Sequence, residues 1–174
     1  IPEPSREEKE EMILAACGHA ASMGLVSVQD MCATPEEVKI YIDLAERGLL
    51  PVLVYGAVND EPLYAPVRMG NYACRMVKAL YDGALGSHGA ALDADYADAP
   101  GERGVTMWNV DDLSALAGKC LERDFQLAVH AIGDRAARET LDAFEKALAA
   151  NPRDDHRFRL EHVQIISAAD IERI

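Results

Sequence analysis

The chain has 174 residues, of which 49% are hydrophobic, and this is enough apolar sequence to build the core of one ordinary domain. Lysine and arginine number 17 against 30 aspartates and glutamates, so the net charge is -13. A charge of this sign repels polyphosphates and anionic lipids, which excludes nucleic acid and membrane surfaces as expected partners and favours a small-molecule substrate.

The cysteines are widely spaced and contain neither a Cys-x-x-Cys pair nor a zinc-finger pattern, which predicts reduced and mostly buried thiols at Cys17, Cys32, Cys74 and Cys120. The sequence has no apolar run of about 18 residues that would indicate a membrane span. It opens on a Pro- and Glu-rich stretch rather than on a signal peptide. We therefore expect a cytoplasmic protein.

Helix signals recur along the chain. Ser5 and Glu8 have the spacing of a capping box, which predicts a helix from Arg6 to Met23. Thr34 with Glu37 repeats this signal and opens a helix that should end at Gly48. Later helical patterns are expected at three further places: Val110–Arg123, Arg135–Ala150 and from Ser167 onward.

Short apolar runs between these helices predict strands at Leu25–Val28, Val52–Val58, Cys74–Leu80, Gln126–Val129 and Phe158–Leu160. Several runs are continuous rather than alternating, which suits strands that are covered on both faces in a parallel sheet. Strand, helix and strand in regular succession indicate βαβ units. Two long connections, Asn59–Asn71 and Asp82–Asn109, interrupt the rhythm, and loops of this length are usually functional.

Three of the predicted strands end in a side chain that an apolar core would not select: Lys78, His130 and His162. The carboxyl ends of barrel strands converge on one face, so ligands from separate strands can meet there. Neutral imidazole is the commonest protein metal ligand. An ammonium group has no lone pair, so Lys78 can serve only as a neutral amine or as a carbamate. The competing interpretation is a satisfied core histidine and a lysine that reaches solvent.

Three segments around these residues resemble successive blocks of the amidohydrolase family 3 group: Val77–Ser87, Val129–Ala136 and Arg159–Gln164. This group contains the YtcJ-like hydrolases, the N-substituted formamide deformylases and, more distantly, the D-aminoacylases. Gly24–Asp30 is similar to the block that follows the first metal motif of the group. The blocks occur in the order of the family and span nearly the whole chain.

The resemblance implies an α/β fold, a partial TIM (β/α)8 barrel in which the five predicted strands are barrel strands 2 to 6. Residues 1–174 would then be the central part of the barrel domain, with strand 1 and strands 7 and 8 outside it. Lys78 matches a strand-4 lysine that is carboxylated in many relatives and bridges two metals, and His130 and His162 match metal-binding histidines. The His-x-His pair of strand 1 and the catalytic aspartate of strand 8 have no counterpart in this chain, so no catalytic residue is assigned.

The activity that the resemblance implies is a metal-dependent hydrolase cleaving an amide or other C–N bond of an N-acyl or N-formyl substrate by a metal-activated water. The cofactor would be a divalent metal, zinc by expectation, as one or two ions. Asp82, Ser87 and His88 are candidate substrate-binding residues in the long connection after Lys78. A turn-forming Asp-Gly is the competing interpretation of Asp82, and many relatives carry arginine where His88 stands.

Alternative functions remain open at this point. A catalytically incomplete fragment or degenerate homologue would keep only the scaffold, and this piece by itself is expected to have an incomplete metal site and little activity. A serine hydrolase lacks support without a Gly-x-Ser-x-Gly elbow, as does a dinucleotide-binding protein without Gly-x-Gly-x-x-Gly. Open strand edges would favour a homo-oligomer. Asp134 is expected to N-cap the helix that follows it, with contact to a metal ligand as the alternative role. Glu161 is expected to anchor its strand or to meet Arg159 or Arg135.

Overall fold

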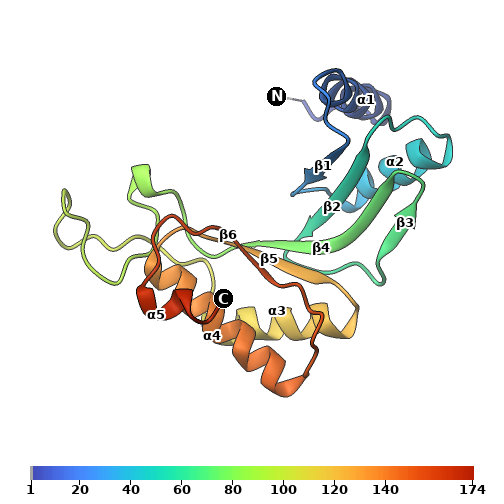
Figure 1. The fold of residues 1–174 in the computed structure, drawn as a ribbon. Helices are drawn as coiled ribbons and strands as arrows, with labels where there is room; N and C mark the ends of the chain where they lie inside the picture. Colours follow the sequence, from blue (N-terminus) through green and yellow to red (C-terminus); the bar gives the residue numbers. More distant parts are fainter. Residues whose placement is uncertain (1) are drawn as a thin grey trace. The chain divides into compact units, whose positions relative to one another are not determined.

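The structure, a computed structural model, describes residues 2–174 and divides into two compact units, Ile1–Val77 and Lys78–Ile174 (Figure 1). Its strands form one sheet in the order β1-β2-β4-β5-β6, with β3 added to β4 on the side. The strand β4 (Tyr72–Leu80) contributes residues to both units. No helix within residues 2–174 combines the length and the apolarity that crossing a bilayer requires.

The first unit contains two helices, α1 (Arg6–Ser22) and α2 (Pro35–Glu46), and both predicted capping boxes are present. The parallel strands β1 (Ser27–Asp30) and β2 (Leu53–Asn59) pair with each other. Their core consists of apolar side chains from α2 and the strands, among them Ile40, Leu44, Val54, Tyr72 and Met76.

One strand of this unit was not expected. The segment β3 (Val67–Met69) pairs antiparallel with the beginning of β4, inside the stretch 59–71 that the sequence predicts as a loop. Three residues in a Pro- and Gly-rich stretch carry too little periodicity to indicate a strand, so only the pairing with β4 defines it. The predicted strand at Leu25–Val28 begins two residues later than expected, at Ser27.

The second unit contains the end of β4, a short 3-10 turn η1 (Leu85–Ser87) and the helices α3 (Val110–Glu122), α4 (Asp134–Ala150) and α5 (Ala168–Ile171). The strands β5 (Gln126–Ala131) and β6 (Arg159–His162) pair in parallel. The helices α3 and α4 pack against each other and cover an apolar core that includes Leu113, Phe125, Leu127, Val129 and Leu141. The parallel α/β arrangement expected from the sequence is therefore confirmed.

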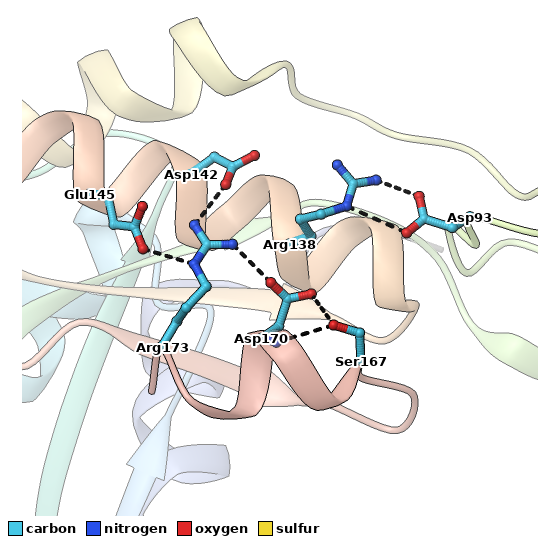
Figure 2. A network of polar contacts seen from close by, with 7 residues as sticks. All are labelled: Asp93, Arg138, Asp142, Glu145, Ser167, Asp170 and Arg173. Atoms are coloured by element: carbon cyan, nitrogen blue, oxygen red, sulfur yellow. Dashed lines mark hydrogen bonds and ion pairs between the residues drawn. The ribbon is translucent and has the colours of Figure 1, made fainter.

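A polar network fixes the end of the chain to α4 (Figure 2). Ser167 caps α5 and donates a hydrogen bond of 2.6 Å to the buried carboxylate of Asp170. Arg173 forms ion pairs with Asp170 at 2.8 Å, with Asp142 at 2.7 Å and with Glu145 at 2.8 Å. Because Asp142 and Glu145 belong to α4, this one guanidinium ties α5 to the neighbouring helix.

A second ion pair on α4 reaches the long connection after β4. Arg138 binds the carboxylate of Asp93 from within α4 (Figure 2). The backbone N–H of Asp93 also donates to the side chain of Asp134 at 2.9 Å. The connection is therefore attached to the first turns of α4 by side chains as well as by backbone.

Candidate functional site

Lys78 lies near the end of β4, and its side chain is buried. Only 6% of the residue is exposed, which contradicts the interpretation that this lysine reaches into solvent. Val77 and Ala79, on either side of it in the strand, are completely buried. An amine held in such surroundings costs free energy as an ammonium unless an opposite charge compensates it.

The side chains of His130 and His162 come together at the ends of β5 and β6. Their ring centroids are 4.5 Å apart and the rings meet edge to face, at 69°. The side chain of His130 is mostly buried, with 16% exposed, whereas His162 is exposed. The structure thus brings two of the three predicted ligands into contact.

The backbone at the end of β6 makes this contact possible. In the parallel register Ala131 is opposite His162, so a regular strand would direct the side chain of His162 to the face opposite that of His130. His162 instead has φ 75° and Val163 has φ 45°, and this left-handed backbone ends the alternation. A non-glycine residue in this region costs about 1–3 kcal/mol, and such strain tends to occur at functional sites.

The His130 ring is held in its neutral form. Burial lowers the pKa of His130 below its ordinary value, and the nearby charge of His162 lowers it further. A hydrogen bond to the backbone of Gly83 and the carboxylate of Asp82 oppose this shift without reversing it. The Nε2 atom is buried without a hydrogen-bond partner in the part of the chain that the structure describes. The ring therefore donates to Gly83 through Nδ1 and keeps a lone pair on Nε2.

The free lone pair on Nε2 of His130 shows whether the residues of this site could hold a metal ion. A metal-ligating histidine typically donates its other ring N–H to a carbonyl or carboxylate, and the Gly83 contact has this form. Two imidazoles in contact with each other suit zinc and neighbouring transition metals. Within residues 2–174, however, no group of three or more His, Cys, Asp or Glu side chains is placed to hold an ion. His130 and His162 fit a metal as part of a ligand set.

The three predicted substrate-binding residues do not converge. Asp82 is 1% exposed, whereas Ser87 is an exposed residue of η1 whose hydroxyl donates to the Ala84 carbonyl at 3.2 Å. His88 has φ 54°, packs on Tyr96 and places Nε2 3.1 Å from a carboxylate oxygen of Asp98. A role for these residues in substrate binding remains a prediction.

The carboxylate of Asp82 accepts three backbone N–H groups from segments far apart in the sequence. Ala91 donates at 2.9 Å, and Ile132 and Gly133 donate at 2.9 Å each. Its Oδ1 also lies 3.5 Å from His130 Nε2, a contact that does not form a hydrogen bond. Sequence reasoning did not predict this arrangement, because only the adjacent Gly83 suggested a local turn.

The N-terminus of α4 differs from the prediction. Gly133 is the N-cap and Asp134 is the first helical residue, so Asp134 does not have the expected capping position. The carboxylate of Asp134 accepts the N–H of Arg135 and that of Asp93, each at 2.9 Å. Gly133 is required at the N-cap for lack of space, since a Cβ there would lie 2.0 Å from the Ala91 carbonyl oxygen.

Two smaller predictions are confirmed. Glu161 forms an ion pair with Arg159 at 2.8 Å. The four cysteines are free thiols, and all but Cys32 are buried.

The fold resembles that of solved metal-dependent hydrolases. An uncharacterized metal-dependent hydrolase from Pyrococcus horikoshii OT3 superposes with a TM-score of 0.87 at 26% identity, over 98% of this chain and 35% of the other. One from Pyrococcus furiosus gives 0.88 at 28% identity, over 98% of this chain and 36% of the other. The expected fold class, a partial (β/α)8 barrel of α/β type, is confirmed by this likeness.

The sequence comparisons identify the family. The family model described as "Amidohydrolase family" matches residues 1–174, and the chain belongs to this family. It is 28% identical to the protein LONG AFTER FAR-RED 3 of Arabidopsis thaliana over 99% of its own length and 33% of that protein. It is 40% identical to YtcJ of Bacillus subtilis (strain 168), whose name assigns it to the amidohydrolases, over 56% of its own length and 18% of that protein. The chain thus spans about a third or less of these relatives. The family match, the likeness to YtcJ and the two solved structures support a hydrolase.

Proposed function

We propose that this chain forms part of the active site of a metal-dependent hydrolase that cleaves an amide or other C–N bond of an N-acyl or N-formyl substrate. The observation that carries the proposal is the buried, unpartnered Nε2 of His130 within residues 2–174, in a ring that touches the ring of His162. A histidine that served only to fill the core would use both ring nitrogens or lie where water could satisfy them. The lone pair instead points to a cation as its missing partner.

The residues that would hold a divalent metal, zinc by preference, are His130, His162 and a carboxylated Lys78. When bound, one or two such ions would supply a water of lowered pKa and polarise the substrate carbonyl. The chain itself positions the two imidazole rings. The Gly83 carbonyl fixes the tautomer of His130, and the left-handed backbone at His162 turns that ring toward it.

A catalytically incomplete scaffold is the second candidate. It is favoured by the lack, within residues 2–174, of three clustered His, Cys, Asp or Glu ligands. A scaffold of this kind would keep the fold but would not retain a metal. The two candidates therefore differ in a quantity that can be measured without knowledge of the substrate.

The experiment compares wild-type full-length protein with two lysine variants. Lys78→Ala removes the buried amine, and Lys146→Ala is the control because its side chain is 58% exposed and pairs with Asp111 on the surface. Metal content by elemental analysis and hydrolysis of a panel of N-acyl and N-formyl amides are measured on each. We expect Lys78→Ala alone to lose bound metal and amidase activity. Unchanged metal content in Lys78→Ala would refute the bridging role, and no metal in the wild type would favour the scaffold.

A further inference from the structure

The end of β4 and the turn between β5 and α4 are joined by one buried carboxylate. Asp82 accepts N–H groups from Ala91, nine residues later in the chain, and from Ile132 and Gly133, 50 and 51 residues later. Its side chain is completely buried. A buried carboxylate is tolerated only where hydrogen bonds or opposite charge replace its hydration. Three N–H donors supply most of that replacement here.

The same carboxylate compensates for a helix that has no capping side chain. The N-cap of α4 is Gly133, which has no side chain to accept a hydrogen bond. The Ala91 carbonyl accepts the N–H of Ala136 at 3.3 Å, and Asp82 lies against the N–H groups of Ile132 and Gly133. The positive end of the helix dipole stabilises a negative charge in this position. The Ala91 carbonyl therefore takes the place of a cap, and the Asp82 carboxylate adds a negative charge at this helix end.

His130 is the side chain that this arrangement surrounds. It precedes Ile132 by two residues in β5, and its ring hydrogen-bonds the backbone of Gly83, the residue next to Asp82. Both the strand that carries the ring and the carbonyl that orients it are thus fixed by the same carboxylate. Asp82 Oδ1 lies 3.5 Å from the Nε2 lone pair, so its negative charge is also close to any cation bound there.

We infer that Asp82 is a positioning residue for His130. It holds the Gly83 carbonyl and the end of β5 so that the imidazole presents Nε2, while its own side chain is buried and engaged by backbone donors. The inference rests on the proposed function for the identity of the ligand, a divalent cation. The placement and tautomer of the ring do not depend on that identity.

The test uses Asp82→Asn in the full-length protein, a change that keeps the shape but removes the charge and turns one acceptor into a donor facing backbone N–H groups. Asn109→Ala is the matched control. Asn109 caps α3 by accepting the Asp112 N–H at 2.9 Å. Asn109→Ala therefore removes an acceptor of a backbone N–H at the beginning of a helix, as Asp82→Asn does, but away from His130. Thermal unfolding of both variants shows whether they lose similar stability.

Two readouts follow. The first is zinc affinity, measured by competition with a chelator, which we expect to fall about 10- to 100-fold in Asp82→Asn and to stay unchanged in Asn109→Ala. The second is the tautomer of His130, measured on metal-free protein by nitrogen NMR of 15N-histidine at a pH above about 6.5. The His130 signal is assigned by its loss in His130→Gln.

We expect the wild type and Asn109→Ala to show His130 protonated on Nδ1, and Asp82→Asn to show a mixture of tautomers. If Asp82→Asn keeps the wild-type tautomer and the wild-type zinc affinity, the positioning role is wrong and Asp82 acts only on stability. If the wild type binds no zinc, the proposed function fails, and the tautomer measurement alone then decides the role of Asp82. The two failures are therefore distinguishable.

Discussion

Replacing Gly133 by alanine would disrupt the point where the long connection after β4 meets the N-terminus of α4. A Cβ at this position would lie 2.0 Å from the oxygen, 2.5 Å from the carbon and 2.8 Å from the nitrogen of the Ala91 backbone. These are backbone atoms, so no flexible side chain can move aside, and the Ala91 peptide itself must shift. The backbone of Gly133 itself has φ -80° and ψ 157°, which alanine adopts readily, so the cost comes from packing alone.

The size of this cost follows from the contacts that the shift would break. Overpacking of a buried position costs about 1–3 kcal/mol. Moving the Ala91 peptide also weakens its hydrogen bonds with Asp82 and with Ala136, and each of these contributes about 0.5–1.5 kcal/mol. We therefore expect Gly133→Ala to lower the free energy of unfolding by about 2–6 kcal/mol.

The assay is urea unfolding followed by circular dichroism, with Gly118→Ala as the control. Gly118 lies within α3, and its nearest atom to an added Cβ is Asn151 Nδ2 at 3.9 Å, an ordinary contact. The same substitution there removes a helix-interior glycine, so we expect a gain of up to about 1 kcal/mol. If Gly133→Ala unfolds with the same free energy as the wild type, the close packing of Ala91 against this turn is wrong.

Two further predictions concern stability in the second unit. The Ser167 hydroxyl, followed by Arg173, lowers the pKa of the buried Asp170 carboxyl, so this stabilisation is present above the unfolded value of about 3.9 and is lost as the pH falls through the folded value. We expect Ser167→Ala to cost about 1 kcal/mol at neutral pH and less in acid, measured as unfolding free energy against pH; a difference independent of pH would contradict this. Tyr81→Phe removes the 2.6 Å hydrogen bond from a buried hydroxyl to Glu139 and should cost about 0.5–1.5 kcal/mol in the same assay, and a neutral effect would show that water replaces the bond.

The sequence predicts the elements whose signals are local. The capping boxes at Ser5 and Thr34 fix the beginnings of α1 and α2, because a serine or threonine with a glutamate three residues later satisfies two backbone donors within one turn. The short strand β3 was missed, because its only evidence is pairing with β4 across the sheet. Asp134 was placed one position too early in its helix, since Gly133 offers no capping signal of its own.

The residues of the site also separate into those that the sequence predicts and those that it does not. A lysine and two histidines at strand ends can be recognised from the sequence, because polar residues interrupt apolar runs there, and resemblance to the family suggests why. The contacts of Asp82 could not be predicted, since its partners are backbone N–H groups 9, 50 and 51 residues away. Every residue except proline has a backbone N–H, so no side-chain pattern marks these donors. The left-handed backbone of His162 was also unpredictable, because glycine, the usual signal for it, is absent.

The zinc content of His130→Gln, measured on full-length protein after dialysis against a weak chelator, tests the central claim most directly. His19→Gln serves as the control, because His19 is an exposed residue of α1 in the other unit. The account predicts that His130→Gln loses bound zinc while His19→Gln and the wild type retain it to the same extent. Equal zinc in all three proteins would contradict the assignment of His130 as a metal ligand.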